Sequence, residues 1–148
     1  MIHFEGHEAF PLPPDELYAK LSDAGFLAGC LPDAEVAEAA PDRAVWKQKP
    51  KLSYIAGAIE TTLSVANRVP GESVAFTVQG KGVGATSTVE TALAFRPGEG
   101  GGTLIHWTGD VVTLTGLLKM VPRGLIQATA QTVIRDVWAA VRQRVVLG

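Results

Sequence analysis

The sequence has little cysteine, little net charge and no long apolar run, and each shortage excludes a class of protein. Cys30 is the only cysteine among 148 residues, so the chain cannot form the intrachain disulfides typical of small secreted domains. Thirteen basic against fifteen acidic residues leave a net charge of −2, which does not favour nucleic-acid binding. No segment approaches the ~18 consecutive apolar residues that a membrane-spanning helix needs.

The N-terminus also lacks a basic segment followed by an apolar one, so it does not have the pattern of a signal peptide. Together with the single cysteine, this predicts a cytoplasmic protein, with peripheral membrane contact left open. A length of 148 residues suits one domain, which we expect to span residues 1–148. A chain of this size can bury a core without disulfides or metals.

Turn signals divide the first two thirds of the chain into short elements. The first, residues 2–10, has the pattern of a strand, and the prolines that follow it end it. A helix is expected to begin at Pro14, where the missing N–H costs nothing, and a second is expected over residues 25–31. Strand patterns then follow at residues 35–39, 43–49, 54–67, 73–82, 85–96 and 103–114. Consecutive strands with short turns and alternating apolar residues predict an antiparallel sheet with one buried face.

The last segment, residues 116–146, has the apolar periodicity of a long helix. Apolar side chains recur at steps of three or four, at Ile126, Ala130, Val133, Val137, Val141 and Val145. Pro122 and Gly124 predict a kink or a short break near its start. The fold class is therefore expected to be α+β, with a curved antiparallel sheet of about seven strands around the C-terminal helix. A pocket would lie in the gap between them.

The order of these elements resembles the START/Bet v 1-like (SRPBCC) superfamily, whose fold is called the helix-grip. More narrowly, the chain resembles the CoxG-like family, named for the G subunit of carbon monoxide dehydrogenase. The resemblance is carried by residues 4–6, 13–17, 27–33 (LAGCLPD), 80–82 and 116–146. It implies a cavity for a hydrophobic ligand that is lipid-, isoprenoid- or quinone-like. For the narrower family it implies an accessory role beside a molybdenum-containing enzyme. Many members carry a C-terminal membrane-binding tail, which we do not expect here because the sequence ends at Gly148.

Candidate chemical groups have simpler structural interpretations. His3 and His7 share a strand face but lie about 13 Å apart along it, too far to bind one metal ion, so no metal site is expected. Cys30 is interpreted as a small buried residue rather than a nucleophile. Glycines 80, 82 and 84 lack the pattern of a phosphate-binding loop. No cofactor is expected.

Strand alternation also assigns the charged residues. Glu60, Glu90 and Asp110 are expected on the solvent side of their strands, where they would not act as acids or bases. The alternating lysines at 47, 49 and 51 are either a solvated strand face or a docking patch for an acidic partner.

The leading hypothesis is non-catalytic binding of a hydrophobic small molecule between the sheet and the C-terminal helix. The aromatic residues on the inner face serve either as pocket or as core, and a pocket would use both them and the helix. The expected ligand-binding residues are Trp46, Ile59, Leu63, Phe76, Trp107, Val111, Leu125, Ile126 and Val133. One alternative is an accessory or assembly protein that docks to a redox enzyme. Another is a cyclase- or hydrolase-type enzyme, which would need a polar cluster inside the cavity.

Overall fold

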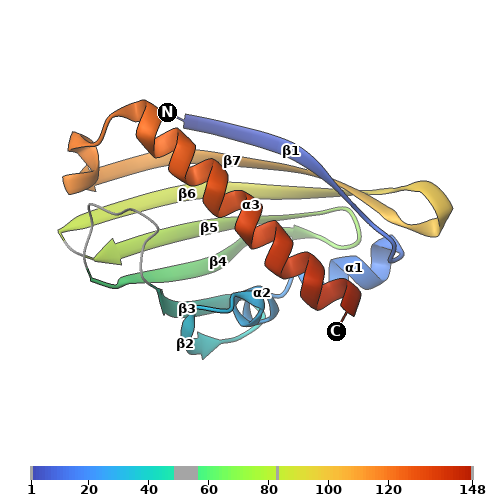
Figure 1. Ribbon diagram of the computed structural model, residues 1–148. Coiled ribbons are helices and arrows are strands. Elements are labelled where there is room, and N and C mark those ends of the chain that lie inside the picture. The colour runs from blue at the N-terminus through green and yellow to red at the C-terminus, as the bar shows by residue number, and fades with distance from the viewer. Residues whose placement is uncertain (1, 49–56, 83, 148) are drawn as a thin grey trace.

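The structure, a computed structural model, describes residues 2–48, 57–82 and 84–147, and these form one antiparallel sheet with helices on one side (Figure 1). The strands are β1 (Ile2–Phe10), β2 (Glu35–Ala39), β3 (Arg43–Gln48), β4 (Ile59–Val69), β5 (Ser73–Gly82), β6 (Ala85–Pro97) and β7 (Thr103–Gly116). The helices are α1 (Pro14–Leu21), α2 (Ala24–Cys30) and α3 (Arg123–Leu147), with short 3-10 turns η1 (Glu99–Gly101) and η2 (Leu117–Met120). None of the helices in the described part is both long and apolar enough to cross a membrane.

The sheet has seven strands in the order β1-β7-β6-β5-β4-β3-β2, each antiparallel to its neighbours. The order follows from a meander of β2 to β7, with β1 returning to pair with β7 at the far edge. α3 crosses the sheet obliquely, from η2 at one end to α1 and α2 at the other (Figure 1). This confirms the predicted α+β helix-grip architecture.

The start of the last helix is where the prediction was wrong. Residues 103–116 remain in β7, η2 follows, and α3 begins only at Arg123, directly after Pro122. Gly116 has φ = +63°, a conformation that side-chain-bearing residues rarely adopt, and this ends the strand with a sharp change of direction. The apolar residues before Pro122 therefore belong to a 3-10 turn and not to the helix. The predicted start of β4 at residue 54 and the end of β3 at Lys49 fall outside the described residues.

Local sequence signals explain how α1 and α2 form. Pro14 occupies the first turn of α1, and Asp15 and Glu16 stand at its positive end. In α2, the Asp23 side chain caps the helix by accepting a hydrogen bond from the Phe26 N–H at 3.1 Å. Both helices thus begin where residues that satisfy or tolerate the free N–H groups occur.

Side chains from the sheet hold α1 and α2 against one end of it. The Tyr18 hydroxyl donates to the Ser73 carbonyl oxygen at 2.9 Å. The Arg68 guanidinium donates to the carbonyl oxygens of Ser22 and Pro41 and pairs with Asp42. These bonds tie β4 and β5 to the helices and to the β2–β3 turn.

The buried apolar residues form two separate clusters rather than one continuous core. The larger cluster joins α1, α2 and the nearby strands and includes Leu17, Leu21, Phe76, Ile105, Val141 and Val145. The smaller cluster lies at the η2 end and consists of Ile2, Ala85, Val111, Leu118 and Ile126. Because α3 contributes to the first cluster near its C-terminus and to the second near its N-terminus, the helix is fixed at both ends.

Candidate ligand-binding site

A cavity of about 470 Å³ lies between α3 and the sheet, with a lining that includes residues of both core clusters. Its volume falls in the usual range for small-molecule sites, roughly 300–1,000 Å³. The lining is mostly apolar, and Gln48, Thr61, Ser87 and Thr91 are its only hydrogen-bonding side chains besides the indoles, within the described part of the chain. No acid, base or thiol side chain takes part in it there. The arrangement can bury an apolar molecule but offers no acid–base pair.

The sheet side of the cavity is built from cross-strand rows. One row runs Leu63–Val78–Val89–Val111 across β4, β5, β6 and β7. A second row runs Phe76–Thr91–Gly109–Phe4 across β5, β6, β7 and β1. Every member of these rows lines the cavity, because alternate residues of adjacent antiparallel strands share one face of the sheet.

Glycine deepens the second of these rows. A Cβ at Gly109 would have only one neighbour within 4 Å, the Thr91 Oγ1 at 3.5 Å, which is ordinary contact. Gly109 therefore leaves open space where a side chain would fit. The missing side chain accounts for part of the depth of the cavity at β7.

The helix side of the cavity is provided by one stripe of α3. Its members are Ala130, Val133, Ile134, Val137, Trp138 and Val141. Val133 and Val137 are 38% and 37% exposed, although they belong to the predicted apolar stripe. Because both line the cavity, they border open space instead of packing on the sheet. Val141, one turn further on, is buried in the larger cluster.

Seven of the nine predicted ligand-binding residues line the cavity: Trp46, Ile59, Leu63, Phe76, Trp107, Val111 and Val133. Two do not. Leu125 is 43% exposed in the first turn of α3, and Ile126 is buried in the smaller cluster with Leu118. Both lie at the end of α3 that closes against η2. Whether the seven residues contact a ligand stays a prediction.

Sequence reasoning missed several cavity residues. Val78 and Val89 lie on the same alternating faces as predicted residues, so their alternation could have identified them. Val137 and Trp138 lie on the predicted apolar stripe of the helix and could have been found in the same way. Gly109 and Thr91 gave no such signal, because neither is apolar enough to mark an inner face.

The tryptophans of the lining differ in how their N–H groups are used. Trp46 Nε1 donates to Gln48 Oε1 at 3.2 Å. Trp107 Nε1 is buried and has no hydrogen-bond partner among the described residues. The Trp107 and Trp138 ring centroids lie 6.4 Å apart, so β7 and α3 approach each other through these two rings.

A second hollow, a groove of about 730 Å³, lies between β1 and α3. Its walls combine an apolar set with a polar rim that includes Glu5, Glu8, Gln131, Arg135 and Arg142. Four residues line both the groove and the cavity: Phe4, Trp107, Ile134 and Trp138. These four form the partition between the two spaces.

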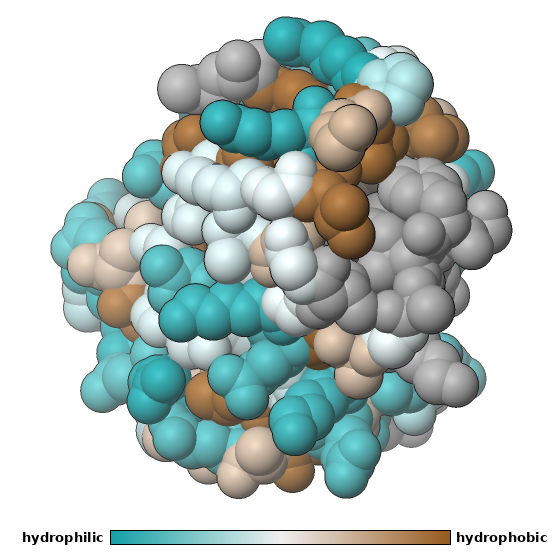
Figure 2. All heavy atoms as spheres, turned by 90° about the vertical axis from the view of Figure 1, so that its left-hand side faces the viewer, coloured by the Kyte–Doolittle hydropathy of each residue, from teal (hydrophilic) through white to brown (hydrophobic). Residues whose placement is uncertain are grey.

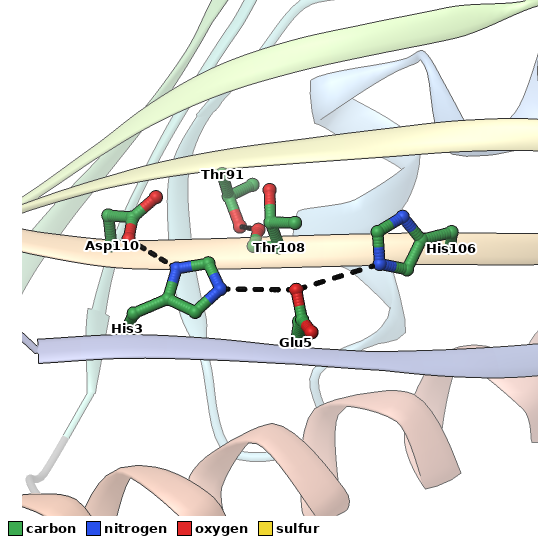
Figure 3. A network of polar contacts seen from close by, with 6 residues as sticks. All are labelled: His3, Glu5, Thr91, His106, Thr108 and Asp110. Carbon is green, nitrogen blue, oxygen red and sulfur yellow. Dashed lines mark hydrogen bonds and ion pairs between the residues drawn. The ribbon is translucent and has the colours of Figure 1, made fainter.

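The other face of the β1–β7 pair carries a polar network (Figure 3). His3 Nδ1 lies 2.5 Å from Asp110 Oδ1, and His3 Nε2 lies 3.2 Å from Glu5 Oε2. His106 Nε2 lies 3.8 Å from the same Glu5 oxygen, and the His106 ring stacks on His7. The hydrogen bond to Asp110 and then that to Glu5 raise the pKa of His3 above its usual 6.5. Among the residues placed by the structure, no group of three such side chains is arranged to hold a metal ion.

The remaining candidate residues lie away from the cavity. Glu60 and Glu90 are exposed, as the strand alternation predicted. Cys30 is buried, and burial raises the pKa of its thiol, with Arg144 opposing the effect. Lys47 is exposed, whereas the lysines at 49 and 51 lie outside the described residues.

The η2 end of the molecule exposes several apolar side chains. Figure 2 views this end and shows apolar side chains gathered in its upper part, where β7 ends and η2 lies. Leu117, Met120 and Leu125 are 54%, 82% and 43% exposed. None of the three lines the cavity.

Comparison with solved structures places the fold. A conserved protein from Geobacillus kaustophilus superposes with a TM-score of 0.83 at 15% identity, covering 98% of this chain and 95% of that one. A START superfamily protein from Mycobacterium smegmatis gives 0.69 at 11% identity, covering 97% and 96%. Ara h 8.0201 gives 0.67 at 15% identity, covering 99% of both chains. At these identities the likeness shows the fold alone.

Comparison of the sequence with known proteins shows the family. No curated protein matches the chain. Residues 6–146 match the family described as CoxG, the G subunit of carbon monoxide dehydrogenase, and this match covers nearly the whole sequence. The chain has the START/Bet v 1-like fold and belongs to the CoxG family of carbon monoxide dehydrogenase proteins.

Proposed function

We propose that the protein binds a hydrophobic small molecule in the cavity between α3 and the sheet and catalyses no reaction on it. The observation that carries the proposal is an apolar lining around about 470 Å³, with no titratable side chain among the lining residues that the structure describes. Burial of each 100 Å² or so of apolar ligand surface would contribute about 2.5 kcal/mol. A lipid-, isoprenoid- or quinone-like molecule has enough such surface for useful affinity.

The ligand would lie against both walls of the cavity. The residues proposed to contact it on the sheet are Trp46, Ile59, Leu63, Phe76, Trp107 and Val111, and on the helix Val133. Since Val133 and Val137 already border open space, ligand burial would cover apolar surface that water now reaches. A ligand would thus complete the packing between the middle of α3 and the sheet.

Thermal unfolding in the presence of apolar molecules tests the proposal. A ligand that binds only the folded protein raises the melting temperature in proportion to the logarithm of its concentration. We expect such a rise with long-chain isoprenoid, quinone or aliphatic compounds. The absence of any rise across this set would contradict the proposal.

The family favours a second role, as an accessory or assembly protein of a molybdenum-containing enzyme of the carbon monoxide dehydrogenase type. This role would use the outer surface, so it is compatible with a filled or an empty cavity. Recovery of that enzyme's chains with the protein from its native host, identified by mass spectrometry, would support it. A cytoplasmic location, inferred from the single cysteine, belongs to the same proposal.

A cyclase- or hydrolase-type activity is the least supported candidate. It would need titratable groups that face the bound molecule. The described lining offers only amide, hydroxyl and indole groups. An enzyme of this class is therefore not proposed.

A further inference from the structure

The Trp107 indole N–H is the only buried side-chain nitrogen or oxygen without a hydrogen-bond partner in the parts of the chain that the structure describes. A buried donor without a partner costs about 1–3 kcal/mol, and such groups are few in folded proteins. The other hydrogen-bonding side chains nearby do have partners. Trp46 Nε1 donates to Gln48, and Thr91 Oγ1 donates to the Thr108 carbonyl oxygen at 2.7 Å.

The surroundings of Trp107 are shaped to hold its ring. Gly6 of β1 lies directly opposite Trp107 in the register of the sheet. A Cβ on Gly6 would lie 2.7 Å from the ring atom Cζ2 and 3.0 Å from Nε1, so the N–H edge of the indole lies over a backbone with no side chain. Trp138 of α3 approaches the same ring. Glycine at position 6 thus makes room for an indole whose donor is unused.

The same ring lies at the boundary between two different environments. Trp107 lines the apolar cavity on one side and the polar-rimmed groove between β1 and α3 on the other. A donor at such a boundary suits a ligand whose apolar body fills the cavity and whose polar atom lies at the partition. Tryptophan is well fitted to this use because its ring is apolar and its N–H is a donor only.

We propose that the Trp107 N–H donates a hydrogen bond to an oxygen acceptor of the bound molecule, which makes the ligand an apolar compound with a neutral carbonyl-type oxygen. This inference rests on the proposed function. The N–H is covered in the structure, so the ring turns about its Cβ–Cγ bond when the ligand enters, a torsion with a broad, roughly two-fold preference. The open space at Gly109, on the same strand, gives room beside it.

The charge of the lining decides between a neutral and an ionised acceptor. No cation takes part in the cavity lining within the described residues, so a carboxylate would lose its hydration without gaining a counter-ion. A ketone, ester or quinone oxygen loses much less on transfer and gains the indole donor. A neutral carbonyl is therefore favoured over a fatty-acid carboxylate.

Displacement of the dye Nile red by 2-undecanone and by undecane tests this, because the two compounds have the same number of carbon atoms and differ in the carbonyl oxygen. In the wild-type protein we expect the ketone to bind about tenfold more tightly than the alkane, the worth of one hydrogen bond. Trp107→Phe should abolish that preference and leave undecane affinity within about threefold. Trp46→Phe is the matched control, because its N–H already bonds to Gln48, and it should keep the preference.

A measurement on the unmodified protein removes the dependence on a variant that fails to fold. In a proton–nitrogen NMR spectrum, the Trp107 indole signal should move downfield on addition of 2-undecanone and not on addition of undecane. Equal binding of the two compounds to wild type, or a preference that survives Trp107→Phe, would overturn the inference and leave the proposed function intact. Failure of both compounds to bind would overturn both.

Discussion

Arg142 of α3 donates a hydrogen bond to Glu8 Oε1 of β1 at 2.9 Å, which fixes the helix to the edge strand of the sheet. The same guanidinium donates to the Ala9 carbonyl oxygen at 2.6 Å and lies 4.3 Å from the centre of the Phe10 ring. These contacts lie at the C-terminal half of α3, beyond the stripe that faces the cavity. They hold the helix in place without filling the space between helix and sheet.

Substitution of this arginine should destabilise the fold. Arg142→Leu removes two hydrogen bonds and a cation–π contact and should lower the free energy of unfolding by about 1–3 kcal/mol. Arg142→Lys should recover only part of the loss, because lysine lacks the planar fork. Urea unfolding measures both effects. Arg135→Leu, on the same helix and exposed, is the control and should change stability by less than about 0.5 kcal/mol. Equal effects of Arg142→Leu and Arg135→Leu would contradict the assignment.

Filling the cavity from the sheet side should abolish ligand binding without unfolding the protein. Gly109→Leu places a side chain in the open space beside Thr91, in a strand conformation that leucine accepts. We expect its melting temperature to equal or exceed that of wild type, while the ligand-induced rise in melting temperature disappears. Differential scanning calorimetry with and without 2-undecanone measures both quantities.

The matched control for this variant is Gly124→Leu. A Cβ at Gly124 meets nothing within 4 Å, and the residue is exposed in the first turn of α3, outside the cavity. This variant should retain the full ligand-induced rise. Retention of the rise in Gly109→Leu as well would show that ligands do not occupy the space beside Gly109.

The turn after β7 should tolerate only glycine. Gly116 has φ = +63°, and a Cβ there would collide with the Gly84 carbonyl oxygen. Gly116→Ala should therefore lower the free energy of unfolding by at least about 1–3 kcal/mol. Gly124→Ala, where there is space, should instead raise it by roughly 0.5–1 kcal/mol, since alanine favours the helix. Chemical denaturation of the two variants gives the comparison, and destabilisation of similar size in both would contradict this explanation of the turn.

The His3 network should give a pH-dependent contribution to stability. The pKa of His3 is raised in the folded protein, so this contribution is fully present below the unfolded value of 6.5 and is lost as pH rises through the folded pKa. NMR titration of the histidine Cε1–H signals measures the folded pKa directly. Asp110→Asn should lower it toward 6.5, and Glu5→Gln should lower it less, because the bond to Asp110 is the larger cause. A wild-type His3 pKa at or below 6.5 would refute the network.

Strand alternation and turn residues predicted most of the fold. The bounds of β1, β2 and β5 match the sequence prediction residue for residue, because glycine, proline or charged turns flank each of them. The last helix was placed too early, because apolar spacing alone does not distinguish a 3-10 turn from the start of an α-helix. Only Pro122 marked the true boundary, and the prediction treated it as a kink.

The cavity was predictable where it follows from periodicity and not where it follows from packing. Trp46, Leu63 and Phe76 line it because alternation fixes which strand face is inside. Ile126 has the same spacing as Val133, but η2 covers that end of the helix and Ile126 packs on Leu118. The space at Gly109 has no signature in the sequence, since it arises from a side chain that is missing.

The most direct measurement is a crystal structure of the wild-type protein grown with 2-undecanone. We expect density for one molecule between the middle of α3 and the sheet, in contact with Val133 and Leu63 and with its oxygen within hydrogen-bond distance of Trp107 Nε1. A structure in which saturating ketone binds only on the outer surface, or in which α3 packs onto the strands and closes the space, would contradict ligand binding in this cavity.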